Sequence, residues 1–271
     1  MKELKKSEFF TVLPILREKR NDLTFSYSVI HHVIPGRVFV DNNISPKTAL
    51  IVTESGLYRI VGNEENECFN RQVGEFFLKN LTQSGNRFTL CSSSSTWDMN
   101  IVSLIGDKIL KSKRISFEYN TDKSNLNVGW REKIPEGFII ERINKDIIRR
   151  CEEFNEEYYI KFWGNVDNFI SNGFGYCALF KDKVVSACTS IYAGGEYAEI
   201  DIFTDKDFRG KGLGGLVGNI FIEHCTENNI LPSWDCEINN LSSFKLAERL
   251  GFESKREYTI YVRKNLNYKG F

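Results

Sequence analysis

A glycine-rich loop is the part of this sequence whose residue types most directly suggest chemistry. It consists of Arg209, Gly210, Lys211, Gly212, Leu213 and Gly214, between a predicted strand and a predicted amphipathic helix. Backbone N–H groups at the start of a helix carry partial positive charge, and glycine allows both close approach of a ligand and positive φ. The loop is therefore predicted to hold a pyrophosphate.

Two other glycine-rich motifs bind nucleotides and must be distinguished from this loop. Gly210, Gly212 and Gly215 satisfy the G-x-G-x-x-G spacing of dinucleotide-binding folds. In those folds the first glycine follows its strand almost directly, whereas the charged stretch 205–209 intervenes here, and too little chain follows to complete a doubly wound sheet. The G-x-x-x-x-G-K-[ST] pattern of P-loop proteins is absent. An NAD-binding oxidoreductase is therefore disfavoured, and a glycine-rich turn without a ligand is the simplest structural alternative.

The elements that must position this loop are expected to form an antiparallel meander followed by alternating helices and strands. β-branched and aromatic runs bounded by turns indicate strands, and apolar residues three or four apart indicate helices. Strands are predicted at 175–180, 184–192, 197–203, 233–237 and 253–262, and helices at 144–157, 212–227 and 241–250. Because the last strands alternate with helices, they are expected to pair in parallel through crossovers. The predicted class is α/β with a mixed sheet.

The first half of the chain is also predicted to mix helices and strands. The patterns indicate helical spacing at 4–20, strand-like alternation at 25–29, a hairpin of 49–52 with 57–61, a helix at 70–81 and a strand at 87–91. The polar, turn-rich stretch 118–136 suits a connection between domains. We therefore predict a boundary near Ile134, with an N-terminal α/β domain at 1–133 and a second domain at 134–271.

The composition is typical of a soluble globular protein, and the net charge does not indicate a charged partner. Lys+Arg and Asp+Glu both number 36, so the zero net charge favours neither nucleic acid nor an anionic membrane as a partner. The 7 cysteines are scattered without a Cys-x-x-Cys pair, and the 3 histidines lack metal-binding spacing. We therefore expect reduced thiols, no metal site and, since no signal-peptide core or membrane span is evident, a cytoplasmic location.

The second half of the sequence resembles the GNAT superfamily of N-acetyltransferases. The match comprises the strand from Ala198 to Thr204, the loop Arg209-x-x-Gly212-x-Gly214 and the segment 240–252 with its Leu-Gly-Phe ending, in this order and spacing. The resemblance covers about the last half of the chain. The first half resembles the partner region of two-part GNAT proteins, for which a degenerate copy of the same fold is one interpretation, although no glycine loop marks it.

The resemblance implies acetyl-CoA as co-substrate, wedged between the strand that ends at Thr204 and the strand around Trp234, which splay apart. Backbone groups at 202–204 would pair with the pantetheine and polarise the thioester carbonyl, the amides at 209–215 would hold the pyrophosphate, and helix residues from Asn240 on would line the thiol path. The implied cofactor-binding residues are Ile202, Phe203, Thr204, Arg209, Gly210, Lys211, Gly212, Leu213, Gly214, Gly215, Asn240, Ser243 and Phe244.

The resemblance also implies an amine acceptor, which needs a base because an alkylammonium group has a pKa of about 10.4. Glu199 is the first choice, since related enzymes often carry a catalytic glutamate in this strand. Alternation places it on the same side as Asp201 and opposite Ile200. Either carboxylate could be the base, and Glu237 on the neighbouring strand is a third candidate. The structural alternative for Glu199 and Asp201 is that they lie on a solvent-exposed face of the strand.

Four further residues bear on the mechanism. Ala247 stands where many GNAT enzymes carry a tyrosine that protonates the departing thiolate, which would leave this step to solvent. Cys236 could act as a nucleophile, although a buried apolar thiol fits it better. Phe162 and Trp163 could line the acceptor site. We therefore expect direct attack in a ternary complex, with a non-catalytic CoA-binding regulatory module as the alternative. The acceptor, a small-molecule or protein amine, and the oligomeric state stay open.

Overall fold

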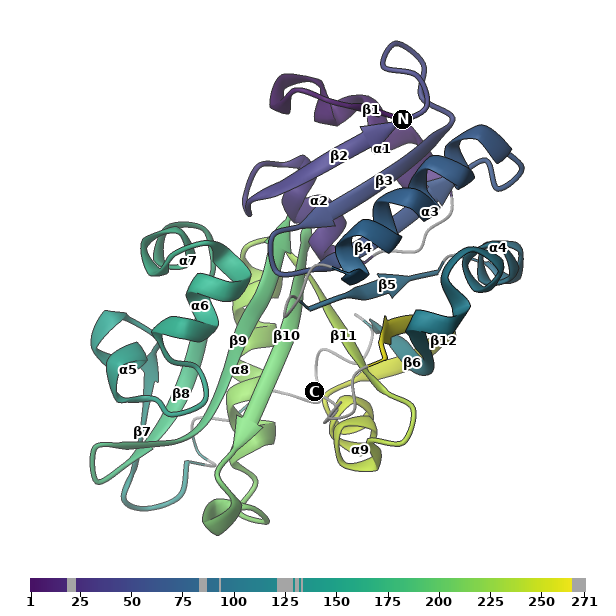
Figure 1. Cartoon of the computed structure of the whole chain (residues 1–271). Helices are drawn as coiled ribbons and strands as arrows, with labels where there is room; N and C mark the ends of the chain where they lie inside the picture. The colour runs from purple at the N-terminus through teal and green to yellow at the C-terminus, as the bar shows by residue number, and fades with distance from the viewer. Residues whose placement is uncertain are drawn as a thin grey trace. The chain divides into compact units, whose positions relative to one another are not determined.

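The computed structural model describes residues 1–18, 23–82, 87–92, 94–120, 129, 132 and 134–264. Contacts between Cα atoms divide the chain into two compact units, whose elements are labelled in Figure 1. Unit 1 comprises Met1–Arg114 and Glu257–Phe271, and unit 2 comprises Ile115–Arg256. This division falls before Ile134 and returns the end of the chain to unit 1, whereas the domains expected from the sequence were 1–133 and 134–271. Much of the expected connection 118–136 lies outside the described residues.

Unit 1 contains an antiparallel group of strands followed by a parallel crossover. In order along the chain its elements are β1 (Lys2–Glu3), a 3₁₀ helix (Lys6–Val12), α1 (Leu13–Glu18), α2 (Thr24–Ile30), β2 (Gly36–Val40), β3 (Thr48–Thr53), β4 (Leu57–Gly62), α3 (Glu67–Thr82), β5 (Thr89–Cys91) and α4 (Ser95–Ile105). Strands β1 to β4 are antiparallel neighbours, and β5 is parallel to β4. The predicted hairpin, the helix at 70–81 and the following strand are confirmed.

Segment 25–29 was predicted to alternate as a strand, and this prediction is wrong. These residues lie in α2, all of whose side chains are buried. Ser28 alternates with apolar neighbours as it would in a half-buried strand, but its hydroxyl donates to the carbonyl of Thr24 at 3.0 Å. Ser26 is buried as well, so polar alternation here marks no solvent-facing side.

Unit 2 carries the meander and crossover predicted for the second half. Its elements are β7 (Phe138–Arg142), α5 (Lys145–Arg150), α6 (Glu156–Trp163), α7 (Val166–Asn172), β8 (Gly175–Phe180), β9 (Lys183–Gly194), β10 (Tyr197–Thr204), α8 (Leu213–Glu227), β11 (Leu231–Glu237) and α9 (Leu241–Arg249). Strands β7 to β10 are antiparallel neighbours, and β11 is parallel to β10. Strands β6 (Ile109–Tyr119) and β12 (Phe252–Arg263) have residues in both units.

The single helix predicted at 144–157 is instead two helices, α5 and α6. The backbone becomes extended at Cys151, and α6 begins after Asn155, whose side chain accepts a hydrogen bond from the N–H of Tyr158 at 3.1 Å. An asparagine that caps a helix start satisfies an amide that has no partner within the helix, and it therefore marks a boundary. Phe154 keeps the connecting turn buried, which is why the apolar spacing seemed continuous.

The two units repeat one order of elements: an edge strand, short helices, three antiparallel strands, a helix, a parallel strand, a helix and a long strand. The first repeat runs from β1 to β6 and the second from β7 to β12, and the long last strand of each has residues in both units. The interpretation of the first half as a degenerate copy requires this order. None of the described helices is long and apolar enough to cross a membrane.

The core of unit 2 fixes α8 against the sheet (Figure 1). Val217 and Phe221 are fully buried in a cluster with residues of β8, β9 and β10. Gly218 lets the side chain of Leu250 pack closely against α8, because a Cβ at this position would lie only 2.7 Å from Leu250 Cδ1. Helix α8 is thereby held along the sheet, with its first turn just beyond the end of β10.

Candidate functional site

The glycine loop between β10 and α8 has the conformation that its residues require. Gly210 and Gly212 adopt φ of +78° and +79°, a region that L side chains rarely occupy. A Cβ built at Gly210, Gly212 or Gly215 would meet no heavy atom within 4 Å, so the space beside the loop is open. The glycines are therefore not needed for packing here, and the unfilled space can admit a ligand to the backbone.

The first turn of α8 presents its amides without a cap. Gly212 occupies the N-cap position, no described side chain caps the helix, and its first turn contains no acidic residue. Arg209 and Lys211 in the preceding loop are exposed, and the Arg209 Nε donates to the carbonyl of Thr204 at 3.1 Å, which ties the loop to the end of β10. Helix dipole and side chains thus favour an anion at the same place.

Strands β10 and β11 separate next to this loop. Their paired residues run from Tyr197 and Leu231 to Glu199 and Ser233, yet β10 continues to Thr204 and β11 to Glu237. Over the same stretch β10 stays paired with β9, as far as Thr204. The edge of β10 that faces β11 therefore runs on past the paired segment, at Ile202, Phe203 and Thr204, where an extended ligand could hydrogen-bond.

The predicted residues of α9 hold that helix in place. The Asn240 side chain accepts a hydrogen bond from the Ser243 N–H at 3.1 Å and so caps α9. The Ser243 hydroxyl accepts from Trp234 Nε1 at 3.0 Å, which ties α9 to β11. The Phe244 ring packs edge-on against Phe117, with centroids 5.2 Å apart. All three thus lie where α9 begins, beside the strand that leaves β10.

The two faces of β10 differ in the way that alternation predicts. Ala198 and Ile200 belong to the core with α8, and Ile202 packs against it. Glu199 and Asp201 therefore lie on the opposite face, and both are half-buried. On that face Phe203 packs edge-on against Phe154, with centroids 5.1 Å apart. This side of β10 is therefore not fully exposed to solvent, because α6 and the turn before it cover part of it.

Tyr158 of α6 is a candidate site residue that the sequence patterns did not reveal. Its hydroxyl donates to Asp201 Oδ2 at 2.8 Å. Desolvation, followed by the negative charge of Asp201, raises the pKa of Tyr158 well above its usual value, so the phenol keeps its proton. The two residues are 43 positions apart, and an aromatic residue on an amphipathic helix is usually a packing residue. No local pattern could have signalled this pair.

The remaining candidates lie in the interior. Trp163 is fully buried, and its Nε1 donates to the Ser190 carbonyl at 3.1 Å, so it belongs to the core of unit 2. Phe162 is 6% exposed and packs against Tyr158. Cys236 is 4% exposed and Ala247 fully buried. The 7 cysteines are all free thiols, and within the described ranges no group of His, Cys, Asp and Glu could hold a metal ion.

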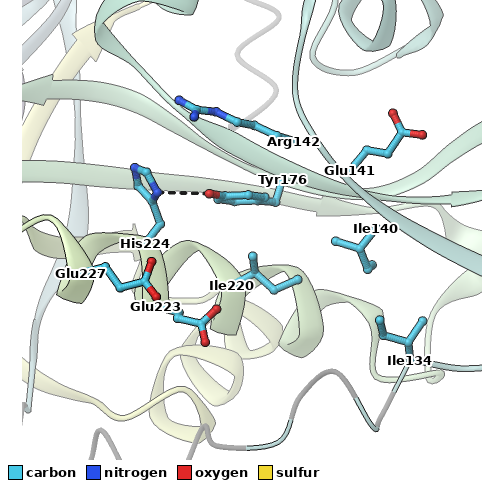
Figure 2. A pocket seen from close by; sticks show the side chains of 9 residues that line it. All are labelled: Ile134, Ile140, Glu141, Arg142, Tyr176, Ile220, Glu223, His224 and Glu227. Carbon is cyan, nitrogen blue, oxygen red and sulfur yellow. Dashed lines mark hydrogen bonds between the residues drawn. The ribbon is translucent and has the colours of Figure 1, made fainter.

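A pocket of about 470 Å³ lies elsewhere in unit 2, between the second half of α8 and strands β7 and β8 (Figure 2). Its described lining residues include none of those predicted for the site; they are Ile134, Ile140, Glu141, Arg142, Tyr176, Ile220, Glu223, His224 and Glu227. The Tyr176 hydroxyl and His224 Nδ1 are 3.1 Å apart in this wall. Burial, followed by the charge of Arg142, lowers the pKa of His224. The pocket is thus separate from the glycine loop at the start of α8.

Comparison with known proteins gives the chain a family. The family model described as GNAT acetyltransferase matches residues 14–261, so it includes the first half, which lacks the glycine loop. The chain is 40% identical over 261 residues to a protein of Bacillus subtilis strain 168 named uncharacterized N-acetyltransferase YdfB, a match that covers 96% of this chain and 98% of that protein.

Solved structures agree with this assignment at the level of the fold. A GCN5-related N-acetyltransferase-like protein from Streptococcus suis is 22% identical, with a TM-score of 0.72 over 95% of this chain and 99% of that one. A tandem GNAT protein from the clavulanic acid biosynthesis pathway is 11% identical, with a TM-score of 0.65 over 96% of each chain. The family model over residues 14–261 and the 40% identical relative show that the chain belongs to the GNAT acetyltransferase family.

Proposed function

We propose that this acetyltransferase transfers an acetyl group from acetyl-CoA to an amine by direct attack in a ternary complex, and that the cofactor binds where β10 and β11 separate. One observation carries the proposal. The start of α8 has no side-chain cap and has open space beside Gly210 and Gly212, and it lies next to Thr204 at the end of β10, beyond the last β10–β11 pair at Glu199 and Ser233. Family membership implies the use of acetyl-CoA and an amine acceptor.

The chain's own residues supply two kinds of cofactor contact. The amides from Leu213 to Gly215, at the positive end of α8, would hold the pyrophosphate together with the charged side chains of Arg209 and Lys211. The backbone N–H and C=O groups of β10 at 202–204 would form hydrogen bonds with the pantetheine, which would take the place of a neighbouring strand. An amide of this edge would also polarise the thioester carbonyl.

The reaction then requires one base and one bond exchange. Glu199, on the β10 face opposite α8, takes a proton from the acceptor ammonium directly or through water, and the free amine attacks the carbonyl carbon. A C–N bond forms, the C–S bond breaks, and coenzyme A leaves as a thiolate, while the nitrogen of the new amide gives its second proton to solvent. Because the buried Ala247 has no proton to donate, the thiolate takes its proton from solvent.

Thermal unfolding with and without acetyl-CoA tests the cofactor site. A ligand at 100 times its Kd that binds only the native protein stabilises it by about 2.7 kcal/mol. We expect that shift in the wild type and its loss in Gly212→Glu, which places a carboxylate in the anion site. Gly195→Glu is the matched control, because Gly195 also has positive φ and is exposed but lies in the β9–β10 turn. Loss of the shift in both variants, or in neither, would contradict the assignment.

Thiol release in the presence of amines tests catalysis. We expect release from acetyl-CoA only when an amine acceptor is present, since direct attack forms no acetyl-enzyme. Binding of acetyl-CoA without thiol release from any amine would instead identify a non-catalytic CoA-binding module, the function that the absence of a tyrosine at Ala247 favours. Release of one equivalent of thiol without an amine would point to a covalent intermediate.

A further inference from the structure

The β10 face opposite α8 carries an acidic group backed by aromatic rings, which we call the aromatic wall. Its members come from α6, the turn before α6 and two strands; they are Phe154, Tyr158, Phe162, Tyr192 and Phe203. Ring centroids of contacting pairs are 4.7 Å apart for Phe154 and Tyr158, 4.8 Å for Tyr158 and Phe162, and 5.8 Å for Phe162 and Tyr192. Tyr192 is opposite Glu199 in the β9–β10 register, so the wall extends to the proposed base.

Only part of the wall is reachable from solvent. Phe154, Phe162 and Tyr192 are 2%, 6% and 2% exposed and form its buried backing. Tyr158 and Phe203 are half-buried, as is Asp201 beside them. A molecule that approaches this face therefore meets a carboxylate flanked by a phenol and a phenyl ring.

Tyr158 holds the Asp201 carboxylate in place. Its hydroxyl donates to Asp201 Oδ2 at 2.8 Å, and the phenol stays protonated because burial raises its pKa well above the usual value. The Tyr158 hydroxyl donates to one oxygen of Asp201 and so fixes the orientation of the carboxylate. Asp201 is thus positioned to hold a cation, and the proposed role of taking the proton falls to Glu199.

The chemistry of the wall selects the kind of cation. An ammonium group is attracted both to a carboxylate and to the faces of aromatic rings. One ring already accommodates such a group, because Lys161 Nζ lies 5.0 Å from the Phe162 centroid. A carbon chain or ring attached to the amine would bury apolar surface on Tyr158 and Phe203. A body rich in hydroxyls would lose water contacts there without gaining partners.

We propose that Asp201, positioned by Tyr158, binds the acceptor ammonium, and that the aromatic wall selects primary amines attached to an apolar alkyl or aryl body. This inference rests on the proposed acetyl transfer at the same site. The ammonium hydrogen-bonds to Asp201, gives one proton to Glu199 and then attacks the thioester. Asp201 and Tyr158 therefore govern acceptor affinity, whereas Glu199 governs turnover.

The test compares phenethylamine with ethanolamine, a primary amine that has the same two-carbon chain but a hydroxyl in place of the ring. We expect a KM for phenethylamine at least about tenfold lower, since each tenfold corresponds to 1.4 kcal/mol and a buried apolar side chain contributes about 1.5–3 kcal/mol. Asp201→Asn should raise that KM about tenfold or more, and Tyr158→Phe about three- to tenfold. The KM for acetyl-CoA should stay unchanged in both variants.

Tyr176→Phe is the matched control, because Tyr176 also has a hydrogen-bonded hydroxyl in unit 2 but lies in the pocket of Figure 2. It should leave the KM for phenethylamine unchanged. Equal KM values for the two amines, or a Tyr158→Phe variant that changes kcat but not KM, would overturn the inference. Either result with acetyl-CoA turnover intact leaves the proposed function standing.

Calorimetry of phenethylamine binding separates the inference from catalysis. With coenzyme A bound, the wild type should bind phenethylamine about tenfold or more tightly than Asp201→Asn does. This difference does not depend on turnover, so it tests the anchor even if no amine releases thiol. Equal binding by the two proteins would overturn the role of Asp201.

Discussion

Units 1 and 2 repeat the same order of elements but differ at the two places where a cofactor would bind. In each unit a meander leads into a helix and then a parallel strand, and the parallel pairing has three residue pairs, at β4–β5 in unit 1 and β10–β11 in unit 2. The frame is therefore common to both, and what distinguishes them is the chemistry of individual residues within it.

The first difference lies at the start of the crossover helix. Helix α8 begins at Gly212 without a side-chain cap, but the N-terminal turn of α3 is closed by Asn66, whose Oδ1 accepts from the Phe69 N–H at 3.1 Å. Glu67 adds a negative charge to the first turn of α3, and Glu65 precedes it. In unit 1 a phosphate would find the start of the helix already capped by Asn66, and the acidic residues there would repel it.

The second difference lies at the last pair of the parallel strands. Arg59 pairs with Cys91 at that position in unit 1, where unit 2 has Glu199 paired with Ser233. Arg59 is fully buried, and its Nη1 donates to the carbonyl of Ser92 at 3.0 Å, just beyond β5. A side chain thus binds the backbone just past the last strand pair in unit 1, whereas in unit 2 β10 runs on past its last pair to Thr204. A shared fold does not by itself provide a site.

The largest expected effect concerns the base. Glu199→Gln should lower kcat about 10²- to 10⁴-fold, because general base catalysis contributes a factor of that size. The rate of thiol release at saturating acetyl-CoA and amine measures it. Glu65→Gln, an exposed position before α3 in unit 1, is the control and should keep the wild-type kcat. A kcat unchanged in Glu199→Gln would move the base to Asp201 or Glu237.

A second, intermediate effect concerns Arg59. Arg59→Leu should reduce the free energy of unfolding by about 1–3 kcal/mol, because it leaves the buried carbonyl of Ser92 without this donor. Urea unfolding measures the loss. Calorimetric titration should still find one acetyl-CoA per chain in wild type and variant, bound with the same Kd. Two acetyl-CoA molecules per wild-type chain would break the distinction between the units.

The smallest effects concern the two asparagine caps. Asn66→Ala and Asn240→Ala should each cost about 1 kcal/mol of stability, since each removes the acceptor for a helix-start amide. Only Asn240→Ala should also raise the KM for acetyl-CoA, because α9 begins beside the strand that diverges from β10. Thermal unfolding and steady-state kinetics of both variants distinguish these outcomes. An equal rise in KM for Asn66→Ala would place unit 1 in the cofactor site.

The sequence by itself determined the features that depend on local patterns. The glycine loop, α8 and the strands of the meander were predictable because glycine, helical spacing and alternation act over a few residues. The face of β10 that carries Glu199 and Asp201 followed from the same alternation. Local patterns misled where burial hid them, as in α2, whose polar residues Ser26 and Ser28 are both buried.

Only the tertiary structure decided which distant residues meet. The hydrogen bond from Tyr158 to Asp201 joins α6 to β10 across 43 residues, and Arg59 reaches the end of β5 across 33. The end of the β10–β11 pairing likewise depends on how two strands diverge after Glu199. Such contacts arise when the elements pack together, and no periodicity along the chain encodes which side chain will fill a given space.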